Sequence, residues 1–188
     1  MSETQIDRDI QHIVRPFVIQ TENNAMYNSQ LFKELQHRLA SLLEDPVFAK
    51  ARKDRAAQKV GGLEGVIIAH NMVISEEILN LDASSVNGVV NDRKIDDFRK
   101  HITTYLGKNG TGNKGYDNYI AIVSEYLALV VRQPLHPLEV RHLENNPPED
   151  TDRRKYCSWK ARYIKNDHSL CQYCNCLLWP EASEGNYG

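Results

Sequence analysis

Cysteine is absent from the first 156 positions of this 188-residue chain, and all four of its cysteines lie between positions 157 and 176. Long apolar runs are also absent. The longest apolar-rich stretches, near 66–74 and 119–131, are shorter than the about 20 residues that a membrane-spanning helix needs. The first nine residues are charged and lack the apolar centre of a signal peptide, so we expect a cytoplasmic protein without a membrane contact. In a reducing compartment, thiols are expected to bind metal or to react rather than to form structural disulfides.

A strong net charge is missing as well. The chain has 23 Lys and Arg against 25 Asp and Glu, which gives a formal net charge of −2. This balance provides no general argument for nucleic acid or an anionic membrane as a partner. The hydrophobic content of 41% is sufficient to bury a core, and the length fits one domain or one domain with an appendage.

Apolar residues recur at helical spacing through the first 133 residues and predict a mainly α protein, a bundle of five or six helices. The expected helices cover about 6–14, 29–43, 46–60, 63–81, 92–106 and 117–132. Ser29 is predicted to cap the second helix, and Asp45 with Pro46 is predicted to end it and to begin the third. The last helix is apolar on almost every side, which predicts a central position. Glu125, its one charge between Asn118 and Val131, is expected on a polar edge of that helix.

The character of the chain changes after the bundle, which we assign to residues 1–133. Four prolines between 134 and 148 forbid a long helix there. We therefore predict a cysteine-rich metal-binding lobe at 134–180, with little regular structure beyond a short β pair, and a disordered tail at 181–188.

The cysteines follow the spacing C-x13-C-x2-C-x-C, in the stretch CSWKARYIKNDHSLCQYCNC. Two residues between Cys171 and Cys174 let both thiolates face one ion, and the distant Cys157 fits its other side. The fourth ligand stays open among Cys176, His136, His142 and His168. A structural zinc ion contributes on the order of 10–16 kcal/mol to folding in small peptides, more than the few aromatic side chains of this lobe could. Free or redox-active thiols are the alternative. Both Zn²⁺ and an iron–sulfur cluster accept such ligands.

Two further motifs have a binding interpretation. Basic residues interleave with aromatic ones beside the cysteines, an arrangement that can hold single-stranded nucleic acid. They are Arg153, Arg154, Lys155, Lys160, Arg162 and Lys165. Solvation of the metal lobe is the simpler interpretation of these charges. Residues 110–115 match G-x-G-x-x-G, but a helix rather than a strand is expected before them, which favours a helix–helix connection over a dinucleotide site.

The C-terminal motifs resemble those of an uncharacterised protein family of methanogenic archaea, domain of unknown function 2115. The motifs that carry the resemblance are His136-Pro137, Tyr156-Cys157-x2-Lys160 and Leu170-Cys171-x-Tyr173-Cys174. The resemblance implies Cys157, Cys171 and Cys174 as core ligands and His136 as candidate fourth ligand, in competition with Cys176. It also implies an anaerobic cytoplasm, which favours an iron–sulfur cluster.

These features predict a metal-binding accessory or interaction protein, whose iron–sulfur cluster or zinc ion holds a recognition lobe in shape for a protein partner. An iron–sulfur redox protein or enzyme subunit is the alternative. A zinc protein that binds nucleic acid through the basic cluster is a weaker one. The sequence indicates no catalytic residue and no reaction type.

Overall fold

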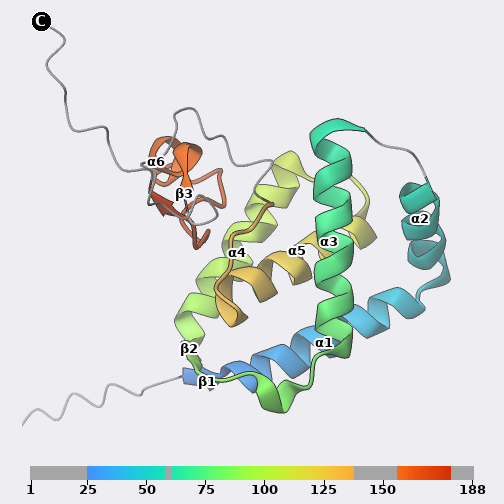
Figure 1. Cartoon of the computed structure of the whole chain (residues 1–188), viewed down its shortest axis with the longest axis horizontal. Helices are drawn as coiled ribbons and strands as arrows, with labels where there is room; N and C mark the ends of the chain where they lie inside the picture. The colour runs from blue at the N-terminus through green and yellow to red at the C-terminus, as the bar shows by residue number, and fades with distance from the viewer. Residues whose placement is uncertain (1–24, 58–60, 138–155, 179–188) are drawn as a thin grey trace, which may run out of the picture.

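The computed structural model describes residues 25–57, 61–137 and 156–178. Most of these residues are helical, which confirms the predicted mainly α class (Figure 1). The helices of the bundle are α1 (Asn28–Glu44), α2 (Pro46–Ala57), α3 (Gly62–Asn80), α4 (Asp92–Asn109) and α5 (Lys114–Glu125). The helix expected at 6–14, the end of the one expected at 46–60, and the tail at 181–188 lie outside the described residues.

Helix α1 contacts α2, α3 and α5. Leu31, Phe32, Leu35 and Leu39 form its fully buried stripe, at the spacing that one face of a helix requires. The predicted cap at Ser29 is wrong, because the helix already begins at Asn28 and no side chain caps it.

The expected junction at 45–46 is confirmed. Asp45 follows the last residue of α1, and its Oδ1 atom accepts hydrogen bonds from the backbone N–H groups of Val47, at 2.8 Å, and Phe48. Pro46 stands at the first position of α2, where a missing N–H costs nothing.

Asn91 begins α4 in the same manner, since its side chain accepts a hydrogen bond from the N–H of Arg93. Helix α5 continues into a π-helical turn, η2 (Tyr126–Val130), all of whose residues are buried. This arrangement confirms the central position expected for the last helix of the bundle. No helix within the described ranges is long and apolar enough to cross a membrane.

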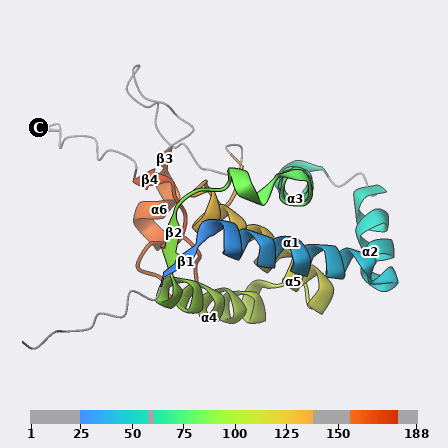
Figure 2. The same ribbon diagram turned by 90° about the horizontal axis from the view of Figure 1, so that it is seen from below.

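Two short strands, which the sequence did not indicate, join the beginnings of α1 and α4. β1 (Ala25–Tyr27) pairs antiparallel with β2 (Val89–Asn91), with Ala25 opposite Asn91 (Figure 2). Before β2 the chain passes through a 3₁₀ turn, η1 (Ala83–Ser85), and through Gly88, whose φ of 100° suits only glycine. The buried Asn28 closes this corner, because its side-chain amide donates to the carbonyl of Asn87 at 3.0 Å.

The C-terminal lobe consists, in its described part, of β3 (Tyr156–Cys157), α6 (Ser158–Tyr163) and β4 (Leu177–Leu178), with β3 and β4 in parallel. The lobe packs against the bundle, where the ring of Tyr173 meets that of Phe98 edge-on at 5.0 Å. Asn175 donates to the carbonyl of Ala128, and His101 on α4 bonds the carbonyl of Ser169. The expected short β pair is therefore present, and the lobe shares the hydrophobic core of the bundle through Leu170 and Tyr173.

Candidate functional site

Three of the four cysteines are buried together between the lobe and the end of the bundle. Cys157, Cys174 and Cys176 form one cluster, each at most 4% exposed, and Leu135 packs against it. The Sγ atoms of Cys174 and Cys176 are 3.4 Å apart, within hydrogen-bonding distance of sulfur. The segment that follows η2 and the C-terminal strand of the lobe thus meet around a set of thiols.

The backbone around the thiols is held by Lys160 of α6. Its ammonium group donates to the carbonyl oxygens of Cys174 and, at 2.6 Å, of Cys176. Cys157 immediately precedes α6, so that the backbone N–H of Lys160 also faces its sulfur. A single lysine therefore fixes the two chain segments that carry the three thiols.

The cluster favours the thiolate form of two cysteines. The hydrogen bond from Cys176 lowers the pKa of Cys157 to about 4, against the opposite effect of burial, and His136 adds to the lowering. The pKa of Cys174 falls to about 5, again chiefly through a hydrogen bond from Cys176. Because the thiolate is the form that binds metals and attacks electrophiles, the cluster is chemically prepared for either role at neutral pH.

His136 lies against the same cluster. Burial alone would lower the pKa of its imidazole, but its hydrogen bond with Cys157 and the nearby thiolate of Cys174 raise it. Its Nδ1 atom is buried and has no hydrogen-bond partner among the described residues. A buried nitrogen without a partner is uncommon and calls for a ligand.

Cys171 differs from the other cysteines. It is only half-buried, and its backbone carbonyl accepts a hydrogen bond from the N–H of Cys174 at 3.3 Å. Burial raises the pKa of its thiol, and its backbone N–H donates to the Oγ of Ser169. The structure thus groups Cys157 and Cys174 with Cys176 and His136, whereas the sequence placed Cys171 ahead of Cys176.

The remaining histidines considered as ligands stand apart. His168 is exposed and lies 3.0 Å from the ammonium nitrogen of Lys108, and His142 lies outside the described residues. In the described ranges, no group of three or more His, Cys, Asp or Glu side chains is already arranged to hold a metal ion. The donors converge, but their thiols contact one another instead of surrounding a common point. Two thiolates on a tetrahedral zinc ion would be about 3.8 Å apart, given Zn–S bonds of about 2.3 Å.

Two of the described basic residues next to the cysteines, Arg162 and Lys165, are exposed and available to a nucleic acid. Lys160 is occupied by the two carbonyl oxygens, while Arg162 is exposed. Arg153, Arg154 and Lys155 lie outside the described residues, so nucleic-acid binding stays a prediction.

The glycine-rich loop directly follows helix α4 and not a strand, and nearby side chains occupy several of its N–H groups. Asn113 accepts from the N–H groups of Gly115 and Tyr116, and Asp117 accepts from that of Thr111. The expectation of a helix–helix connection is confirmed.

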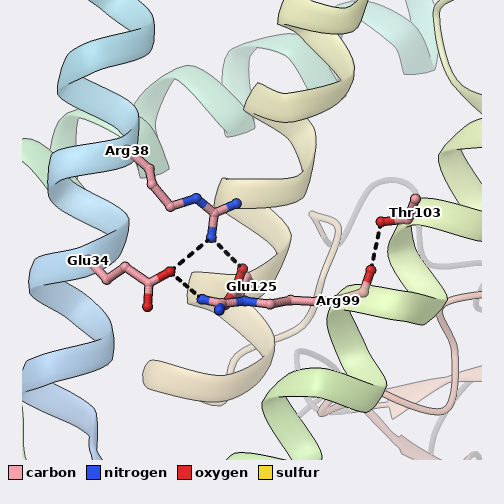
Figure 3. Close-up of polar contacts among 5 residues, drawn as sticks. All are labelled: Glu34, Arg38, Arg99, Thr103 and Glu125. Carbon is pink, nitrogen blue, oxygen red and sulfur yellow. Dashed lines mark hydrogen bonds and ion pairs between the residues drawn. The ribbon is translucent and has the colours of Figure 1, made fainter.

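Glu125 was expected on a polar edge of its helix, and this prediction is wrong. The carboxylate is 1% exposed and lies between two arginines from other helices (Figure 3). Arg38 of α1 approaches one oxygen at 3.0 Å, and Arg99 of α4 approaches the other through Nε at 2.8 Å. Glu34 at the rim bonds Arg99 as well, at 2.6 Å. The signal in the sequence was the isolation of this charge in an apolar helix, which requires partners from elsewhere.

Comparison with known proteins gives a family match and a curated relative. The model of a family described as "Uncharacterized protein conserved in archaea (DUF2115)" matches residues 61–177. The UPF0305 protein MJ0646 of Methanocaldococcus jannaschii is 28% identical over 96 residues, which cover 51% of this chain and 52% of that protein. The chain therefore spans about half the length of this curated relative. No solved structure matches.

Proposed function

The chain belongs to the archaeal family DUF2115, and from this premise we propose that it is a metal-binding accessory protein in which one zinc ion fastens the C-terminal lobe to the helical bundle. The proposed ligands are Cys157, Cys174, Cys176 and His136. The observation that supports the proposal is a cluster of three buried thiols, beside which His136 bonds Cys157 and lies near Cys174, with a buried Nδ1 atom that has no hydrogen-bond partner among the described residues.

The chemistry of the donors supports this assignment. The lowered pKa values of Cys157, to about 4, and Cys174, to about 5, favour the thiolate form that binds metal, and the thiol of Cys176, which causes most of both shifts, releases its proton when metal binds. Thiolates and a neutral imidazole are the ligands of structural zinc. The 3.4 Å between the Sγ atoms of Cys174 and Cys176 needs to widen by only about 0.4 Å to match two ligands of one tetrahedral ion.

The same spacing favours a single ion over a cubane [4Fe–4S] cluster. In a cubane cluster, each thiolate binds a different iron, so neighbouring ligand sulfurs must stand farther apart than two on one ion. Lys160, bonded to the carbonyls of both Cys174 and Cys176, opposes such a separation.

The role of the ion follows from its position. The lobe has few large apolar side chains of its own, and it meets the bundle through Tyr173, Leu170 and Leu135. A metal at the cluster would join the segment after η2 to both strands of the lobe, and would present a rigid surface to a protein partner. An accessory function requires no catalytic group.

The test is metal analysis of protein purified without oxygen, and of the same protein reconstituted with zinc. We expect about one zinc per chain and a colourless solution. Cys176→Ser and His136→Asn should lose most of the zinc, while Cys171→Ser serves as the matched control and should retain it. A brown protein with stoichiometric iron and sulfide would show that the site holds an iron–sulfur cluster in place of zinc. Retention of zinc by the Cys176→Ser variant would refute the proposed ligand set.

A further inference from the structure

A cavity of about 650 Å³ opens between helices α1, α4 and α5. It shares no residue with the cysteine cluster. Helix α4 contributes one face to it, helix α5 another, and α1 closes one end. The residues that line it are Glu34, Arg38, Arg99, Ile102, Thr103, Leu106, Gly107, Lys114, Asp117, Asn118, Ala121 and Glu125. A concave space of this size is typical of sites for small ligands.

The lining changes in character along the cavity. The end at α1 carries the ion cluster of Arg38, Arg99 and Glu125 (Figure 3). Next to it lie Ile102 and Ala121, which are apolar. The α5 residues that line the cavity, from position 114 to position 125, extend over about 16 Å of helix. The space is therefore an elongated groove with a charge-balanced ion cluster at one end and an apolar floor.

The two guanidinium groups are held in place by Glu125, and some of their N–H donors have no hydrogen-bond partner among the described residues. The buried carboxylate of Glu125 accepts from Nη1 of Arg38 and from Nε of Arg99. The Nε and Nη2 atoms of Arg38 and the Nη1 atom of Arg99 have no hydrogen-bond partner among the described residues. Guanidinium donors in a fixed orientation suit the two oxygens of a carboxylate.

The charges at this end balance, so the preference for an anion rests on the remaining N–H donors of the arginines and not on net charge. Two arginines face one carboxylate that is fully buried, and the second carboxylate, Glu34, is 38% exposed at the rim. A single arginine bonded to Glu125 would be enough to join helix α5 to a neighbouring helix. The second one leaves donors that point to a ligand with acceptor oxygens.

We propose that this groove binds an amphipathic organic carboxylate, with its head group on Arg38 and Arg99 and its hydrocarbon chain along Ile102, Leu106 and Ala121. The buried Glu125 is a positioning residue, which orients both guanidinium groups before the ligand arrives. Because neither guanidinium moves far on binding, little ordering entropy opposes association. The apolar floor supplies affinity, and the arginines supply the preference for an anion.

The test is a calorimetric titration of the full chain with three probes of known structure: octanoate, octylammonium and acetate. Octanoate should bind. Octylammonium, with the same chain and the opposite charge, and acetate, with the same head group and no chain, should each bind at least about tenfold more weakly. Equal binding of octanoate and octylammonium, or no heat from octanoate at millimolar concentration, overturns the proposal.

Two variants locate the site. Arg38→Met should weaken octanoate about tenfold, while Arg99 still neutralises Glu125 and keeps the bundle folded. Ala121→Phe should fill the apolar floor and weaken octanoate by a similar factor without any change in charge. Arg93→Met, at a fully exposed arginine of the same helix as Arg99, is the control and should bind like the wild type. Circular dichroism confirms folding. Unchanged affinity in folded Ala121→Phe protein would refute the placement of the chain.

Discussion

The buried ion cluster makes a quantitative prediction about stability. The substitution Glu125→Ala should lower the free energy of unfolding by about 3 kcal/mol. Removing one partner of a buried ion pair costs about 3–5 kcal/mol, because the charge left behind loses its compensation. The lower end applies here, since Arg38 and Arg99 are 30% and 35% exposed and water can solvate them after the change.

Urea unfolding followed by circular dichroism measures this loss. With a denaturant dependence of about 2 kcal/mol per molar urea, the midpoint should fall by about 1.5 M. Asp97→Ala is the matched control, because the pair of Asp97 with Arg93 is 3.9 Å long and its side chains are 60% and 89% exposed. It should change stability by less than about 0.5 kcal/mol.

A loss below about 1 kcal/mol in Glu125→Ala would refute the reasoning. A loss of this size is what an exposed surface ion pair contributes. It would mean that the arginines stabilise the buried carboxylate of Glu125 no more than they would stabilise an exposed carboxylate. A midpoint shift in Asp97→Ala as large as that in Glu125→Ala would refute it as well, because burial would then not be what distinguishes the two pairs.

Three other substitutions test further parts of the structure. The lowered pKa values of Cys157 and Cys174 stabilise the fold fully above the ordinary thiol pKa, and this stability is lost as the pH falls through the lowered values. Between pH 5 and 6 the free energy of unfolding of metal-free protein should therefore rise with pH. A Cys157→Ser/Cys174→Ser variant should show a smaller rise in its urea midpoint. Gly88→Ala should lower the free energy of unfolding by about 1–3 kcal/mol, because the φ of Gly88 is 100° and an added Cβ would lie 3.1 Å from the side-chain nitrogen of Asn28. Gly112 has a φ of 75° and open space around it, so Gly112→Ala should lower the same free energy by about 1 kcal/mol in the same assay. Tyr173→Ala should release the lobe from α4, which limited proteolysis would detect as faster cleavage after residue 137, with the bundle remaining intact.

Local signals in the sequence were sufficient for the helices. Apolar residues at helical spacing placed α3, α4 and α5, and the side chains of Asp45 and Asn91 marked helix boundaries through bonds within a few residues. The pairing of β1 with β2 was missed because it joins Ala25 to Asn91, and nothing in either segment indicates its partner. Ser29 failed as a cap because this pairing fixes where α1 begins.

The candidate site shows the same division. The cysteine spacing predicted the lobe and predicted that Cys157 and Cys174 lie close together, as they do. The order of preference between Cys171 and Cys176 depends on how Lys160 folds the chain back, which spacing does not reveal. The burial of Glu125 depends likewise on arginines that are 87 and 26 residues away.

The position of α1 has a consequence for how the family should be defined. The family match begins at residue 61 of this chain, so the matched segment omits the helix that supplies Leu31, Phe32, Leu35 and Leu39 to the core. A fragment cut at that boundary would expose the apolar surfaces of α3 and α5 and would leave Glu125 without Arg38. The segment that the family match covers is therefore smaller than the unit that shares the hydrophobic core.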